Sequence, residues 1–204
     1  MGCDLHYTFQ NKENGIWKDI DGLERGYDEN WKPEEFNIGR NYILFSVLAG
    51  VRDRWGIKPI SEPRGLPEGI QEEYDDEYQE WYNEYGDHSY SWLTSTEILQ
   101  WFSDNETYMI TQSGIITREE FHSWDGVTPF ESYCQGIGGY NVKVFDSVEN
   151  NYLINSDSKD YNDYTHVRVQ WKEDIIPLIK YFEDMIVKLH LQYGEVRFVF
   201  GFDS

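Results

Sequence analysis

Cysteine is scarce in this sequence, because Cys3 and Cys134 are the only two among 204 residues and no CxxC pair is present. Two isolated cysteines cannot form the disulfide framework of a small secreted domain. The opening MGCDLHYTF lacks the basic and apolar regions of a signal peptide. No apolar run approaches the roughly 18 residues that a membrane-spanning helix needs. We therefore expect a reduced, soluble protein of the cytoplasm with no membrane partner.

Basic residues are also few, since 17 Lys and Arg face 38 Asp and Glu and give a formal net charge of −21. Such a chain repels nucleic-acid backbones, so we expect no direct nucleic-acid binding. The charge fits a soluble surface, a basic partner protein or a bound cation instead. Aromatic residues are plentiful, with 8 Trp, 16 Tyr and 11 Phe, and can build a core. We expect a single domain over 1–204, with an acidic helical flap at 68–87.

Hydrophobic spacing predicts an α+β fold with a largely antiparallel sheet and helices on one face. CDLHYTFQ alternates apolar and polar residues, and the turn NKENG leads to GIWKDI, which together predict an N-terminal hairpin. NYILFSVLAGVRD, residues 41–53, has helical spacing. The strand-like YTHVRVQW, the helical EDIIPLIKYFEDMIVKLHLQYGE and the strand-like VRFVFGFD then predict a C-terminal β-α-β unit.

The stretch 68–87 contains nine acidic residues and no basic one. Its tyrosines and tryptophan recur every three or four residues, which indicates an aromatic stripe along a helix. Such a stripe is typical of a packing surface. The acidic face is either solvated or a mimic of an anionic molecule.

Asp4 and His6 lie two residues apart on the polar face of the first predicted strand, so their side chains are neighbours. A D-x-H pair on a strand is one way to hold a divalent metal, and Asp203 could join it, since first and last strands often lie near each other. In an enzyme, Asp4, His6 and His88 are the candidate catalytic residues, and Asp4, His6 and Asp203 the candidate metal ligands. The alternative is a solvated strand face or a hydrogen-bonded pair. Cys3 points to the other face.

A cluster of arginines between residues 40 and 64 stands out in so acidic a chain. Arg64 lies in PISEPRGLP, where prolines fix the loop and the following glycine lets a ligand approach the backbone. Arginine forks match phosphate oxygens, and DHSYSW adds small donors. The alternative is that the arginines pair with neighbouring carboxylates. The candidate ligand-binding residues are Arg40, Arg52, Arg64, Gly65, His88, Ser89, Ser91 and Trp92.

The segments MGCDLH, RNYILFSVLAGVR, PISEPRGLP and DHSYSWLT resemble a family of uncharacterised bacteriophage and prophage proteins that begin MGCDIH. The resemblance covers the first half of the chain well and VRFVFGFD more loosely. It implies a viral accessory protein acting inside a bacterium, and it carries no established reaction. The family's polar motif positions fall on Asp4, His6, Arg40, Arg52, Arg64, His88, Ser89 and Ser91.

Three functions remain open on this basis. The first is a phage accessory protein, acting against host defence, that sequesters a nucleotide or another phosphate-bearing signal in an Arg/His/Ser-lined pocket. The second is a metal-dependent phosphoesterase in which a divalent metal activates water. The third is an acidic mimic of nucleic acid that inhibits a basic host protein through residues 68–87.

Overall fold

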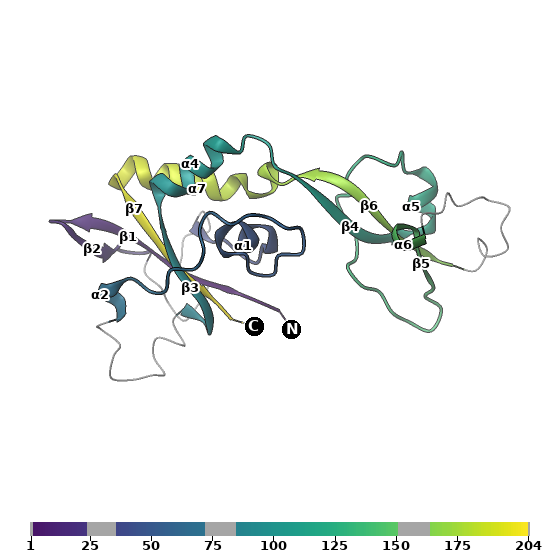
Figure 1. Cartoon of the computed structure of the whole chain (residues 1–204), viewed down its shortest axis with the longest axis horizontal. Helices are drawn as coiled ribbons and strands as arrows, with labels where there is room; N and C mark the ends of the chain where they lie inside the picture. The colour runs from purple at the N-terminus through teal and green to yellow at the C-terminus, as the bar shows by residue number, and fades with distance from the viewer. Residues whose placement is uncertain (1, 24–35, 72–84, 151–163, 204) are drawn as a thin grey trace. The chain divides into compact units, whose positions relative to one another are not determined.

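The computed structural model describes residues 2–23, 36–71, 85–150 and 164–203 (Figure 1). The chain divides into two compact units, one formed by Met1–Tyr108 with Ile175–Ser204 and the other by Met109–Asp174. The second unit is built from a segment inserted into the first, and the single domain over 1–204 stays a prediction. Of the acidic flap predicted at 68–87, a helical turn, α2, spans Glu68–Gln71. Residues 72–84 lie outside the described residues.

The first unit contains a four-stranded sheet, here called sheet A, with the order β2-β1-β7-β3 and antiparallel pairing throughout. Its strands are β1 (Leu5–Glu13), β2 (Ile16–Asp19), β3 (His88–Thr94) and β7 (Val196–Phe202). The predicted N-terminal hairpin is confirmed. Its two turn residues, Asn14 and Gly15, have φ values of 52° and 86°, the left-handed backbone that a tight two-residue hairpin turn requires.

Besides α2, the described residues of the first unit form helices α1 (Tyr42–Ala49), α4 (Ser95–Asp104) and α7 (Ile176–Tyr193). Phe45 of α1 packs on Phe202, and Phe182 of α7 packs on Phe198, so both helices cover the same face of β7. The predicted α+β class is confirmed. Helix α1 is shorter than the predicted 41–53, because Gly50 adopts φ 69° and ends it with a left-handed cap.

The opposite face of sheet A carries a second, smaller cluster. Ile70 of α2, Tyr85 and Val199 are buried together there, and Leu66 and Trp92 pack against them. Tyr85 crosses β7 closely, since a Cβ atom at Gly201 would lie 2.0 Å from the Tyr85 carbonyl oxygen. The polar side chains of β1 therefore share their face with this cluster and not with α1 and α7.

The second unit is built on sheet B, with the order β4-β6-β5. Strand β4 (Met109–Thr117) pairs antiparallel with β6 (His166–Asp174), and β5 (Val144–Asp146) runs parallel to β6. The short helices α5 (Arg118–Ser123) and α6 (Ser147–Asn150) belong to the same unit. Val167, Val169 and Trp171 of β6 form its core with surrounding aromatic rings. The predicted order strand, helix, strand is present as β6, α7 and β7, with β6 in sheet B and β7 in sheet A.

Candidate functional site

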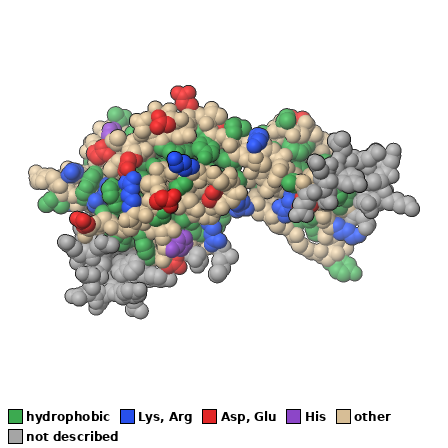
Figure 2. All heavy atoms as spheres, viewed as in Figure 1, with side chains coloured by type: hydrophobic (Ala, Val, Ile, Leu, Met, Phe, Trp, Pro, Cys, Tyr) green, Lys and Arg blue, Asp and Glu red, His purple; other side chains and the backbone are tan. Residues whose placement is uncertain are grey.

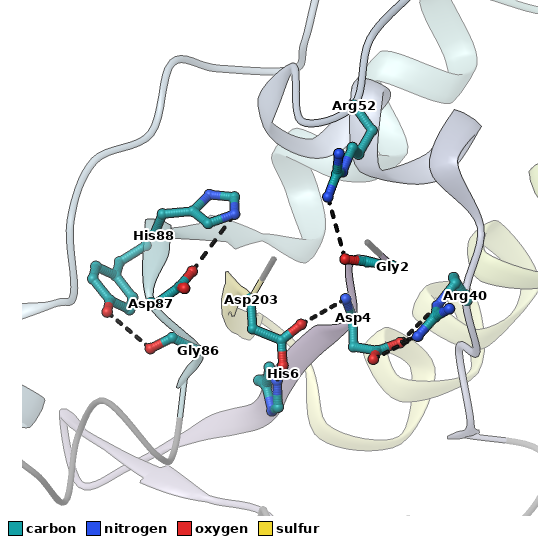
Figure 3. Close-up of polar contacts among 10 residues, drawn as sticks. Gly2, Asp4, His6, Arg40, Arg52, Gly86, Asp87, His88 and Asp203 are labelled. Carbon is teal, nitrogen blue, oxygen red and sulfur yellow. Dashed lines mark hydrogen bonds and ion pairs between the residues drawn. The ribbon is translucent and has the colours of Figure 1, made fainter.

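Three segments that are distant in sequence meet at one end of sheet A. Leu5 pairs with Phe202, and His88 pairs with Phe202 from the other side, so β1 and β3 begin where β7 ends. We call the polar residues gathered there the sheet-end cluster (Figure 3). Its members are Asp4, His6, Arg40, Arg52, His88 and Asp203.

His6 and Asp203 form the central contact of this cluster. The His6 Nε2 and Asp203 Oδ2 atoms lie 2.9 Å apart, and the Asp4 backbone N–H donates to Asp203 Oδ1 over 2.8 Å. Burial alone would raise the pKa of Asp203, but the hydrogen bonds from His6 and from the Asp4 amide outweigh it and lower that pKa. An ionised carboxylate therefore orients the imidazole ring. The other ring nitrogen, Nδ1, has no hydrogen-bond partner among the described residues.

Asp4 is held by a two-pronged ion pair with Arg40. Arg40 Nε donates to Oδ1 over 2.8 Å and Nη2 donates to Oδ2 over 2.6 Å, and this hydrogen-bonded carboxylate raises the pKa of Arg40. The Tyr7 hydroxyl fixes the loop that carries Arg40, because it donates to the Phe36 carbonyl and accepts from the Ile38 N–H. For Arg40, internal pairing with a carboxylate is therefore what the structure shows.

Arg52 reaches the same end of the sheet from the turn after α1. Its Nη2 donates to the Gly2 carbonyl over 3.2 Å (Figure 3). Its backbone has φ 56°, a left-handed conformation that is costly for a residue with a side chain. Cys3 is fully buried beside it, and burial raises the pKa of the thiol while a hydrogen bond with Arg52 opposes that rise.

His88 lies on the opposite face of the sheet from His6. Its ring stacks on Phe202, with 6.0 Å between centroids, whereas His6 is paired with the neighbouring residue Gly201. His88 Nδ1 contacts Ser89 Oγ at 2.9 Å, and Ser89 has a left-handed φ of 54° at a bulge in β3. The predicted catalytic trio is thus divided, with Asp4 and His6 on one face and His88 on the other.

The metal prediction meets a related difficulty. Asp4, His6 and Asp203 do converge as the sequence predicts, but each carboxylate is engaged, one with Arg40 and the other with His6. Across the described ranges, no group of three or more His, Cys, Asp or Glu side chains is placed to hold a metal ion. The cluster is better suited to proton transfer than to metal binding.

Arg64 belongs to a separate group further along β3. Its guanidinium donates to both oxygens of Glu97 over 3.1 and 2.6 Å, and it lies 4.9 Å from the centroid of the Trp92 ring. Its backbone N–H donates to Ser91 Oγ, and the Gly65 N–H donates to the Tyr90 carbonyl. The hydrogen bond from Arg64 is the main reason why the pKa of Glu97 is lowered. Glu97 also completes the capping box of α4 with Thr94, so Arg64 braces the start of that helix.

The eight predicted ligand-binding residues therefore fall into two groups. Arg40, Arg52, His88 and Ser89 lie at the sheet end. Gly65, Ser91 and Trp92 surround Arg64. The sequence reasoning missed Arg197, which is 8% exposed and hydrogen-bonded to Gln10. A lone arginine in the apolar strand VRFVFGF is the signal that could have revealed it.

A scan against protein-family models and searches of the curated proteins and the solved structures find no match for this chain. Among the described residues, no helix is both long enough and apolar enough to cross a membrane.

Proposed function

We propose that this chain binds a small phosphate-bearing ligand at the sheet-end cluster, and that the His6–Asp203 pair exchanges a proton with it. The proposal rests on the 2.9 Å contact between His6 Nε2 and Asp203 Oδ2, which fixes the orientation of the imidazole ring. The other ring nitrogen, Nδ1, has no hydrogen-bond partner among the described residues. An imidazole oriented by a carboxylate can hold a proton toward a phosphate oxygen or accept one from a hydroxyl.

Two further features support an anionic ligand. The Arg52 guanidinium donates to the Gly2 carbonyl at the same end of the sheet. The paired N–H groups of a guanidinium match the spacing of phosphate oxygens. Arg40 neutralises Asp4 through two hydrogen bonds, so this carboxylate opposes an anion less than a free one would. Arg52 and Ser89 both hold left-handed backbone here, and such conformations cluster at binding sites.

The His6–Asp203 pair specifically favours a second function, hydrolysis of the bound ligand. A carboxylate that orients a histidine is the arrangement by which many hydrolases position a general base. In that case His6 Nδ1 would take a proton from water or from a ligand hydroxyl. This keeps hydrolysis as an alternative that uses His6 and Asp203 and does not need the predicted catalytic His88.

The resemblance to bacteriophage proteins supplies the proposed context. A viral accessory protein inside a bacterium would meet host nucleotides, including those used as defence signals. The proposed ligand is therefore a nucleotide or a similar phosphate-bearing small molecule.

Isothermal titration against nucleoside monophosphates, cyclic mononucleotides and cyclic dinucleotides tests the binding proposal. His6→Gln and Arg52→Ala should each weaken binding by about 10- to 150-fold, the cost of losing a charged hydrogen bond of about 1.5–3 kcal/mol. The matched controls are His122→Gln, in the second unit, and Arg54→Ala, whose guanidinium lies 5.2 Å from the Trp55 ring centroid. Equal affinity in His6→Gln and wild type, or no binding by any of these compounds, would contradict the proposal.

Chromatography of the recovered ligand separates the two functions. An unchanged nucleotide supports sequestration. A product that forms with wild type and is absent with His6→Gln, while Arg54→Ala still forms it, supports hydrolysis.

A further inference from the structure

Cationic and aromatic side chains alternate across the face of sheet A opposite α1 and α7. Lys12 Nζ lies 5.5 Å from the Trp17 ring centroid, and the Arg197 guanidinium lies 4.8 Å from Trp17 and 5.9 Å from Trp92. Arg64 covers Trp92 at 4.9 Å. We call these five residues the cation–tryptophan row. Lys and Arg side chains gather beside hydrophobic ones over this part of sheet A in Figure 2.

Arg197 is the unusual member of the row. It is 8% exposed, and its Nε and Nη2 both donate to the neutral Gln10 Oε1, over 2.9 and 2.6 Å. Among the described residues, no carboxylate lies within ion-pair distance of its guanidinium. A buried charge without a direct ion pair is unfavourable, and Asp19 reaches Arg197 only through Gln10, whose Nε2 donates to Asp19 Oδ1 over 2.9 Å. Burial accordingly lowers the pKa of Arg197, although the charges of Tyr85 and Asp19 oppose this.

Of the other two cations in the row, Arg64 is paired with Glu97, and Lys12 leaves positive charge at the surface. Lys12 is exposed on β1, and its ammonium contacts the Trp17 ring. Beside Trp17 on β2, Ile16 is 64% exposed and offers an apolar contact. In a chain with 38 acidic and 17 basic residues, a surface that combines a buried guanidinium with no ion pair among the described residues, an exposed lysine and apolar side chains is complementary to carboxylates.

We propose that the cation–tryptophan row binds an acidic peptide segment of a partner protein, with its Asp or Glu carboxylates directed at Arg197 and Lys12. A peptide fits better than single-stranded nucleic acid. Bases bind such surfaces by stacking on aromatic faces, and the faces of Trp17 and Trp92 are already covered by Lys12, Arg197 and Arg64. A carboxylate needs to reach only the cations.

This proposal is independent of the phosphate-ligand proposal. None of the residues in the row belongs to the sheet-end cluster. Failure of one proposal therefore leaves the other unaffected.

A fluorescein-labelled decamer of glutamate, followed by fluorescence anisotropy with the full chain, tests the inference. Saturable binding should weaken at least tenfold in Lys12→Glu and when sodium chloride is raised from 50 to 500 mM. Lys188→Glu is the matched control, because Lys188 also lies over an aromatic ring, that of Phe36, at 5.1 Å. It should bind within twofold of wild type. Arg197→Gln, checked for folding by circular dichroism, should also lose binding.

Three outcomes would overturn the inference. The first is no saturable binding of the decamer by wild type. The second is an equal loss in Lys12→Glu and Lys188→Glu, which would show only a general charge effect. The third is tighter binding of a labelled dT10 oligonucleotide than of the glutamate decamer, which would assign the row to nucleic acid.

Discussion

His6 and Asp203 are 197 positions apart in the sequence, and their side chains are joined at 2.9 Å between Nε2 and Oδ2. The contact exists because β1 and β7 are antiparallel neighbours, with His6 opposite Gly201 and Leu5 opposite Phe202. It makes Asp203, the last acidic residue in the sequence, a partner of His6, the first histidine. The sheet-end cluster therefore forms only when the first unit is folded, because no single segment of the sequence contains all its residues.

Asp203 should make stability depend on pH in the acid range. Its pKa is lowered in the folded state, so its contribution is fully present above the pKa of an unfolded Asp, about 3.9. The contribution is lost as the pH falls through the lower folded value. The difference in unfolding free energy between wild type and Asp203→Asn, from urea titrations at pH 6, 4 and 3, should shrink at the lowest pH. A constant difference for Asp203→Asn would contradict the prediction.

Arg64→Ala should cost stability and leave nucleotide affinity unchanged, because Glu97 already binds its guanidinium. Both side chains are about one-third exposed, at 30% and 35%, so a double-mutant cycle with Glu97→Gln should give a coupling of about 0.5–1 kcal/mol. Urea unfolding measures it. Arg54→Ala, combined with the same Glu97→Gln, should show no coupling. Loss of nucleotide binding in Arg64→Ala at unchanged stability would restore Arg64 as a ligand residue.

Gly201→Ala should destabilise the first unit by about 1–3 kcal/mol, the usual cost of overpacking. The added Cβ would lie 2.0 Å from the Tyr85 carbonyl oxygen and 2.8 Å from the Tyr90 ring. His6 faces Gly201 across the sheet, so the imidazole signals in NMR spectra should shift as well. Gly136→Ala is the matched control, since nothing lies within 4 Å of its Cβ position. A Gly201→Ala protein as stable as wild type would contradict the close crossing.

Phe198→Ala should remove about 3–5 kcal/mol of stability, as expected for a fully buried aromatic side chain. Its ring lies 5.0 to 5.5 Å from the rings of Tyr7, Phe9, Phe182 and Phe200. Chemical denaturation followed by circular dichroism measures the loss. Tyr140→Ala, at a fully exposed position, should change stability by less than about 0.5 kcal/mol. Similar losses for the two variants would contradict the assigned core.

The fold class could be predicted from the sequence because the hydrophobic patterns of single strands and helices are strong in this chain. The alternation in CDLHYTFQ predicted β1, and the spacing of Ile179, Phe182 and Ile186 predicted the buried side of α7. The division into two units was not predicted. Both units use ordinary strand and helix patterns, and nothing in the composition marks Met109 or Asp174 as a boundary.

The candidate site was predicted in part. Asp4, His6 and Asp203 were expected to converge, since the first and last strands were expected to be neighbours, and they do so. Arg64 was grouped with Arg40 and Arg52 because of their proximity in the sequence and the family resemblance. Its actual partner is Glu97, 33 residues further along the chain. Proximity in sequence does not determine which of many carboxylates an arginine meets.

The sequence by itself determined the α+β class, the N-terminal hairpin, the polar face of β1 and the inward face of α7, because each depends on periodicity within one segment. Only the tertiary structure decided which charges pair, that His88 and His6 occupy opposite faces, and that Arg197 is enclosed by two tryptophans. Those relationships depend on strand register and on contacts between distant segments. A one-residue change in register would send every side chain of a strand to the other face.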